Sequence, residues 1–131
     1  MLHHLEINVS DLKESTAFWG WFLGSLGYDL YQDWPEGRSW RKEATYIVIK
    51  QTAARFMSAG YHRARTGLDH VAFHANSRQH VDETRQTLRN RGVPLLYEDR
   101  YPHAGGPDHY ALFFEAPDRI KVELVAPTPA A

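Results

Sequence analysis

The chain has 131 residues, which is enough for one domain with a real core. Its 15 basic and 16 acidic side chains give a formal net charge of −1, so we expect neither nucleic acid nor a membrane as a partner. There is no cysteine, which excludes disulfides and thiolate metal ligands. No apolar run approaches the roughly 20 residues of a membrane-spanning helix, and the N-terminus has no signal-peptide pattern, so we expect a cytoplasmic protein.

The first half of the chain predicts a strand, a helix and three further strands. Apolar and polar residues alternate over residues 2–9, which is typical of a strand with one buried face. Asp11, with Glu14 three residues later, forms a capping box that begins a helix, and Gly27 stands where that helix should end. The remaining strands are expected at residues 28–33, 39–43 and 45–51, with a turn at residues 34–37.

The second half predicts the same order of elements after a connection at residues 52–67. The basic run at residues 62–65 in this connection is expected to be a solvated loop, with substrate or interface contact as the alternative. Ser77 is placed to begin the second helix and Gly92 to end it. Strands are expected at residues 68–75, 94–97, 109–115 and 120–125. The segment at residues 99–108, rich in glycine and proline, is expected to be a binding loop or a lid.

A fixed spacing shows that the two halves are copies of one unit. His4 and His70, Asp11 and Ser77, and Tyr31 and Tyr97 are each separated by 66 residues (70 − 4, 77 − 11 and 97 − 31). We therefore predict an α+β fold of two β-α-β-β-β modules, residues 2–51 and 68–127, within a single domain over residues 1–131. The modules are expected in a pseudo-twofold arrangement, with curled mixed sheets that enclose a cleft.

Three side chains on the predicted cleft faces form a set of metal ligands. Because side chains alternate along a strand, His4, His70 and Glu123 all lie opposite the core-facing residues of their strands. Two imidazoles and one carboxylate suit a divalent Fe, Mn, Ni or Zn ion and leave positions open for a substrate. His3 competes with His4 for this role, but only His4 matches His70 at the repeat spacing.

Other polar side chains are candidates for proton transfer and for substrate contact. Metal chemistry of this kind needs an acid or a base, and ordinary packing is the alternative for every candidate. For Glu123 the alternative to metal binding is a salt bridge to a nearby cation at residue 119 or 121. The catalytic candidates are His74, His103, Tyr110 and, last among them, His109; the substrate-binding candidates are Tyr101, Lys121, Glu6 and Trp40.

Three segments carry a resemblance to a known family: HLEINVSDL from His4, DHVAFH at residues 69–74, and FFEAPDRIKVEL at residues 113–124. They resemble the vicinal oxygen chelate superfamily, which includes glyoxalase I, extradiol dioxygenases, fosfomycin-resistance enzymes and bleomycin-resistance binding proteins. The resemblance covers residues 2–127. It implies that paired modules enclose a metal held by the residues matching His4, His70 and Glu123, and that the metal chelates two neighbouring oxygens of a small substrate.

Departures from the subfamilies narrow the expected function. Extradiol dioxygenases carry tyrosine where Phe113 stands and glycine where Arg119 stands, so ring cleavage is disfavoured. Glyoxalase I takes a further ligand from the strand matching residues 45–50, which offers no carboxylate here. Bleomycin-type binders lack the ligands that this chain keeps.

The expected function is therefore a small divalent-metal-dependent enzyme of lyase, isomerase or transferase type. The alternative is a metal-free protein that sequesters an antibiotic or metabolite between aromatic side chains. We also expect a homodimer, because curled open sheets leave edges that a partner can cover and relatives of this family usually pair.

Overall fold

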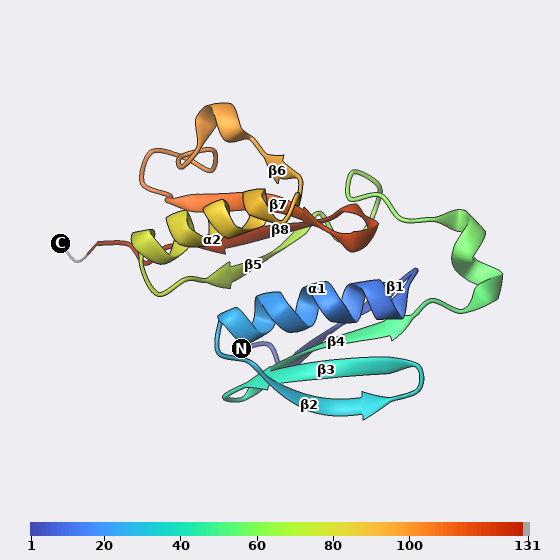
Figure 1. Cartoon of the computed structure of the whole chain (residues 1–131). Helices are drawn as coiled ribbons and strands as arrows, with labels where there is room; N and C mark the ends of the chain where they lie inside the picture. The colour runs from blue at the N-terminus through green and yellow to red at the C-terminus, as the bar shows by residue number, and fades with distance from the viewer. Residues whose placement is uncertain (130–131) are drawn as a thin grey trace. The chain divides into compact units, whose positions relative to one another are not determined.

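The computed structural model describes residues 1–129 and divides into two compact units, Met1–Tyr61 and the residues from His62 onward (Figure 1). Each unit contains one four-stranded mixed sheet and one α-helix in the order β-α-β-β-β. The predicted α+β class and the pair of similar modules with open sheets are confirmed. Over the described residues, no helix combines the length and the apolar character that crossing a membrane requires.

The first unit places its helix on one face of its sheet. Its elements are β1 (His4–Val9), α1 (Leu12–Ser25), β2 (Asp29–Trp34), β3 (Gly37–Lys42) and β4 (Thr45–Gln51). The strand order is β1-β4-β3-β2, with β1 parallel to β4. Asp11 caps α1 by accepting a hydrogen bond from the Glu14 N–H at 3.1 Å, as the sequence predicted. The fully buried Trp19, Phe22 and Leu23 pack this helix onto the sheet.

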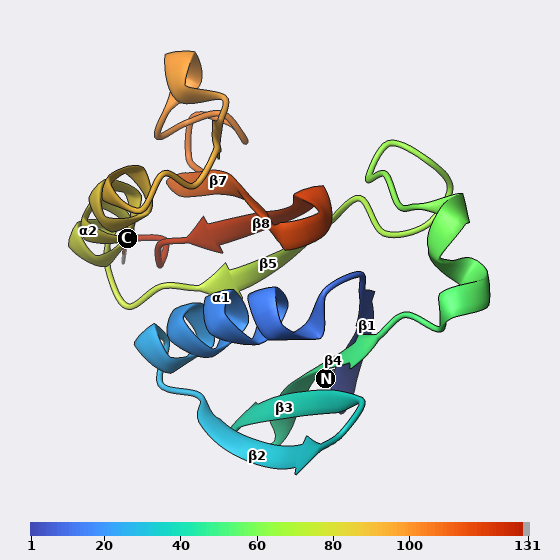
Figure 2. The same cartoon turned by 45° about the vertical axis from the view of Figure 1, so that its right-hand side comes forward.

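The second unit repeats this topology with a longer segment before its last two strands. The chain runs from β4 through η1 (Ala54–Ala59) into β5 (His70–His74), α2 (Arg78–Asn90), β6 (Leu95–Leu96), η2 (Glu98–Arg100), β7 (Ala111–Ala116), η3 (Pro117–Arg119) and β8 (Ile120–Val125). The strand order β5-β8-β7-β6 matches that of the first unit. The segment between β6 and β7, drawn in orange, projects from its sheet (Figure 2).

Equivalent residues stand at equivalent places in the two units. His4 begins β1 and His70 begins β5. Asp11 and Ser77 are the N-cap residues of α1 and α2, and each side chain accepts a hydrogen bond from a backbone N–H three residues ahead. The spacing found in the sequence therefore corresponds to the same structural positions in the two copies.

Alternation along β8 separates a core face from a polar face. Ile120, Val122 and Leu124 are at most 2% exposed and lie on the core face. Lys121 and Glu123 lie on the opposite face, which no helix of this unit covers. This polar face carries the site.

In the basic run of the connection, Arg63 forms contacts within the second unit. The guanidinium of Arg63 donates to the carboxylate of Glu115 and, at 3.0 Å, to the carbonyl of Arg119. The Arg63 and Glu115 side chains are only 17% and 14% exposed. Burial alone would raise the pKa of Glu115, but Arg63 and Arg119 outweigh it and lower the pKa. Arg63 therefore has a structural partner inside its own unit.

Candidate functional site

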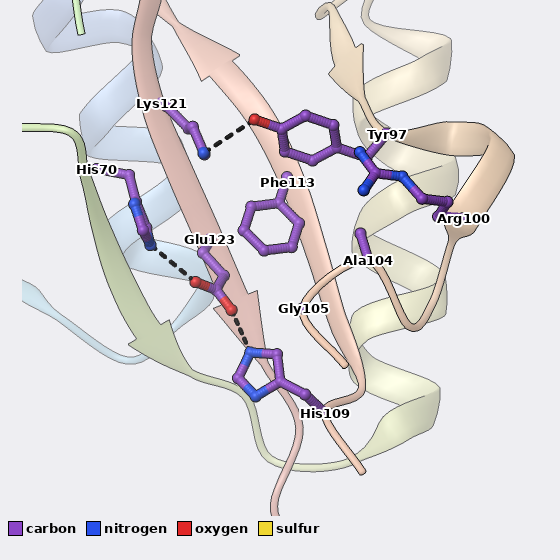
Figure 3. Close-up of a pocket in the computed structure, with 9 residues that line it drawn as sticks. All are labelled: His70, Tyr97, Arg100, Ala104, Gly105, His109, Phe113, Lys121 and Glu123. Carbon is purple, nitrogen blue, oxygen red and sulfur yellow. Dashed lines mark hydrogen bonds and ion pairs between the residues drawn. The ribbon is translucent and has the colours of Figure 1, made fainter. Parts of the chain in front are cut away.

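A cavity of about 430 Å³ opens on the polar face of the second sheet. Its walls come from β5, β7 and β8 and from the segment between β6 and β7 (Figure 3). Glu123, on β8, lies in the wall between His70 and His109. Lys121 lies two residues before Glu123 on the same face of β8, so the cavity has a carboxylate and a cation on one strand.

Two imidazoles contact the two oxygens of Glu123. The Nε2 atom of His70 lies 3.0 Å from Oε1, and the Nε2 atom of His109 hydrogen-bonds to Oε2. The Glu123 side chain is only 7% exposed. A buried carboxylate is costly unless it is hydrogen-bonded, and an N–H group of either imidazole can donate that bond.

The other nitrogen of His70 contacts a second carboxylate. Nδ1 lies 2.7 Å from Oδ1 of Asp69. This hydrogen bond, followed by the charge of Lys121, lowers the pKa of Asp69, which is therefore ionised at neutral pH. When Asp69 accepts the Nδ1 proton of neutral His70, Nε2 presents a lone pair toward Glu123. In that tautomer Nε2 and Oε1 are both acceptors, and an imidazole nitrogen and a carboxylate oxygen placed together can serve as two ligands of a metal ion.

Lys121 lies in an aromatic and anionic environment. Its Nζ atom hydrogen-bonds to the Tyr97 hydroxyl at 2.9 Å and lies 3.5 Å from Asp69 Oδ1. It also lies 5.0 Å from the ring centre of Tyr97 and 5.4 Å from that of Phe113. Burial alone would lower the pKa of Lys121, but Tyr97 and Asp69 outweigh it and raise the pKa. The amine is therefore a persistent positive charge in the cavity wall.

The structure brings His70, Glu123 and Lys121 together, whereas His4 lies in the first unit. His4 is exposed at the start of β1, where its ring stacks on Tyr46 with centres 4.7 Å apart. Its Nδ1 atom lies 2.9 Å from Nδ1 of His3. Among residues 1–129, no three His, Asp or Glu side chains are grouped so that they could hold a metal ion.

Two of the three predicted site residues in the segment before β7 contact α2, and none of the three lines the cavity. The hydroxyls of Tyr101 and Tyr110 both donate to Oδ1 of Asp82, at 2.5 and 2.6 Å. Burial, together with the Asp82 carboxylate, raises the pKa of both tyrosines. His103 is exposed and meets the Tyr110 ring edge-on, with ring centres 5.8 Å apart.

The other three predicted site residues lie elsewhere. His74 is exposed at the end of β5 and does not line the cavity. Glu6 is exposed on β1, next to Val48 of β4. Trp40 is 5% exposed in the first unit, where its indole is the nearest neighbour of Gly20.

The cavity also contains residues that the sequence prediction ranked last or omitted, namely His109, Tyr97 and Arg100. The sequence does contain a signal for His109. Phe113 pairs with Glu123, and alternate residues before Phe113 lie on the same face of the sheet. That pattern leads through Ala111 to His109. Tyr97 and Arg100 gave no such signal, since they lie outside the paired strands.

One position of the repeat differs in a way that bears on the ligands. In the second unit Glu123 of β8 pairs with Ala72 of β5. At the same place in the first unit, Val48 of β4 pairs with Glu6 of β1. Both units therefore carry one carboxylate at this cross-strand pair, but on opposite strands, and β4 supplies none.

Comparison with known proteins identifies the family. The sequence pattern of the family described as Glyoxalase/Bleomycin resistance protein/Dioxygenase superfamily matches residues 3–113. An uncharacterized protein of Bacillus subtilis, YqjT, is 54% identical over 127 residues, which are 97% of this chain and 99% of that protein.

Two solved structures have the same fold. A candidate glyoxalase from Bacillus halodurans is 61% identical, with a TM-score of 0.95 over 97% of this chain and 96% of that one. A lactoylglutathione lyase from Agrobacterium tumefaciens is 16% identical, with a TM-score of 0.67 over 98% and 94% of the two chains. The resemblance inferred from the sequence is confirmed, and the chain belongs to the glyoxalase/bleomycin resistance protein/dioxygenase superfamily.

Proposed function

We propose that this protein is a divalent-metal-dependent enzyme that acts on a small molecule chelating the metal through neighbouring oxygens. The observation that carries the proposal is the opposition of His70 Nε2 and Glu123 Oε1 at 3.0 Å in a cavity wall, with Asp69 orienting the imidazole. A lactoylglutathione lyase among the structural neighbours fits an enzyme. A cytoplasmic location is part of the proposal, and the lack of cysteine fits it.

The metal would be held by His4, His70 and Glu123, the set predicted from the sequence. The second unit contributes the imidazole and the buried carboxylate already described, and the first contributes the exposed imidazole of His4. Fe, Mn, Ni and Zn all accept such ligands. When bound, the ion supplies Lewis acidity to substrate oxygens.

The residues around Glu123 supply the remaining chemistry. His109 can hold or release a proton at Nε2, the atom that contacts Glu123, and is the proposed acid or base. Phe113, opposite Glu123 on β7, places an apolar ring in the cavity wall and offers no hydroxyl. These features fit lyase, isomerase or transferase chemistry, in which a proton moves, better than oxidative ring cleavage.

The experiment that tests this proposal is metal analysis of the purified protein. We expect about one divalent ion per chain, lost in His70→Ala, Glu123→Gln and His4→Ala, because a three-ligand site reduced to two binds a divalent ion poorly. His3→Ala is the matched control for His4→Ala, since it removes the neighbouring imidazole, and it should keep the metal. Thermal melting of each variant identifies any that is merely unfolded.

Two outcomes would contradict the proposal. Metal retained in both His70→Ala and Glu123→Gln would show that these residues are not ligands. A wild-type protein that takes up no divalent ion, yet binds small aromatic ligands in the cavity, would favour the sequestering protein. Tyr97 and Phe113 are the aromatic walls available for that second role.

A further inference from the structure

One end of the cavity collects two positive charges around a single aromatic ring. Lys121 hydrogen-bonds to the Tyr97 hydroxyl, and the guanidinium carbon of Arg100 lies 4.9 Å from the centre of the Tyr97 ring (Figure 3). The Lys121 side chain is only 12% exposed, so its charge is largely withdrawn from water. Two cations that face the same space repel each other unless an anion lies between them.

Arg100 differs from the four arginines of this unit that form ion pairs with a carboxylate. Arg63, Arg85, Arg89 and Arg119 each contact a carboxylate, either Glu115 or Glu98. Across the described residues, the contact of the Arg100 guanidinium is the ring of Tyr97, with no carboxylate bound to it. Its five N–H donors therefore remain available to a planar or tetrahedral anion.

Lys121 is only partly neutralised by its own neighbour. Its Nζ atom lies 3.5 Å from Asp69 Oδ1, the same oxygen that lies 2.7 Å from His70 Nδ1. That carboxylate is shared, and the shorter contact belongs to the imidazole. Lys121 therefore keeps positive charge for a ligand in the cavity.

The geometry of Tyr97 holds this arrangement in place. Tyr97 has φ 57° and ψ 34°, a left-handed conformation that costs a residue other than glycine about 1–3 kcal/mol. Its ring meets Phe113 edge-on at 5.3 Å between centres. A strained backbone conformation persists only where surrounding contacts stabilise it. At Tyr97 this conformation places the ring between the two cations.

We infer that the substrate carries an anionic group, a carboxylate or a phosphoryl or phosphonyl group, which binds between Arg100 and Lys121. The inference rests on the proposed function for the rest of the substrate, whose chelating oxygens would bind the metal beside Glu123. Lys121 and Glu123 are two residues apart on one strand, or about 7 Å. The anion and the chelating oxygens therefore belong to one small molecule, separated by a few bonds, and the cavity of about 430 Å³ accommodates it.

Calorimetric titration of the chelator-treated, metal-free protein with inorganic phosphate, acetate and methylphosphonate tests this inference. We expect at least one of these anions to bind, and its Kd to rise about 10- to 100-fold in Arg100→Ala and Lys121→Met, because each loses a charge-assisted hydrogen bond. Arg55→Ala is the matched control, since Arg55 also lies over an aromatic ring, 4.8 Å from that of Phe56, and should leave the Kd unchanged. The anion that binds most tightly distinguishes a carboxylate substrate from a phosphoryl or phosphonyl one.

Three results would overturn the inference. These are no binding of any of the anions, a Kd unchanged in both cavity variants, or a Kd raised equally in the Arg55→Ala control. Metal content of the same preparations, measured before the chelator treatment, keeps this test separate from the proposed function. Anion binding that depends on Arg100 in a protein that never takes up metal supports the anion site and refutes the metal enzyme. Normal metal content with anion binding independent of Arg100 does the reverse.

Discussion

The position of His109 beside Glu123 depends on a glycine that it touches. A Cβ atom built on Gly105 would lie 2.5 Å from Cδ2 of His109, closer than any real contact. Gly106, the next residue, would meet nothing within 4 Å, but its φ of 133° is a conformation that side chains rarely adopt. The two glycines therefore have different physical roles, one steric and one conformational.

Alanine substitutions separate these two roles. Gly105→Ala should push the imidazole of His109 away from Glu123, which proton–nitrogen correlation spectra of the histidine rings can detect, and lower turnover. Gly106→Ala should instead cost about 1–3 kcal/mol of unfolding free energy through backbone strain, measured by chemical denaturation. Identical histidine spectra in Gly105→Ala and the wild type would show that Gly105 does not position His109.

At the scale of elements, the segment between β6 and β7 is hydrogen-bonded to α2 through one carboxylate, that of Asp82. Tyr101 and Tyr110 both donate to Asp82 Oδ1. Glu98, at the start of the same segment, accepts from Arg85 at 2.9 Å and from Arg89 at 2.5 Å. These contacts hold in place the backbone that carries Arg100 and His109 into the cavity, so α2 acts on the site from the opposite face of the sheet.

Replacement of Asp82 by asparagine should weaken these contacts, because the amide oxygen still accepts hydrogen bonds but carries no charge. Because burial and Asp82 raise the pKa of Tyr101 and Tyr110 above the ordinary value of 10.0, their contribution to stability is complete below that pH and is lost as the pH rises toward the folded pKa. We therefore expect the unfolding free energy of the wild type to fall above about pH 10 and Asp82→Asn to flatten this fall. Denaturant titrations across this range measure it, and parallel curves for the two proteins would exclude the shared carboxylate as the cause.

The elements themselves were largely predictable, and their exceptions have physical causes. β4 and β8 have the predicted bounds because both are short segments rich in β-branched and other apolar residues. β3 begins two residues earlier than expected, at Gly37, where a Cβ atom would lie 2.4 Å from the Trp34 ring. β6 stops at Leu96 because Tyr97 turns left-handed. Such tertiary contacts are not encoded in a local pattern.

The site residues on paired strands were likewise predictable from the sequence, whereas those placed by tertiary contacts were not. Strand alternation was sufficient to bring His70, Glu123 and Lys121 to one face, because β5 and β8 pair directly. The path of the segment between β6 and β7 has no periodicity, so the sequence could not show that Tyr101 and Tyr110 contact α2 while Arg100 lines the cavity. Asp82, the residue that both tyrosines contact, lies outside every motif of the sequence.

At the scale of the whole molecule, the open sheets bear on assembly. Each sheet ends in unclosed edges, and β2, an edge of the first sheet, exposes Leu30 and Tyr31 at 59% and 46%. The connection after β4 exposes Phe56 at 59% and Met57 at 40%. Exposed edges and large apolar side chains favour association, and closed twofold pairs are the commonest result. We therefore propose a homodimer.

Sedimentation equilibrium tests this proposal directly. We expect a mass of twice the 15.1 kDa of one chain for the wild type. Leu30→Lys should weaken the dimer if the β2 edge is covered, because a buried lysine without a partner is costly. The double variant Phe56→Ser, Met57→Ser tests the connection in the same way, and Arg55→Ala, an exposed neighbour, serves as its control. A wild-type monomer at the highest soluble concentration would refute the dimer.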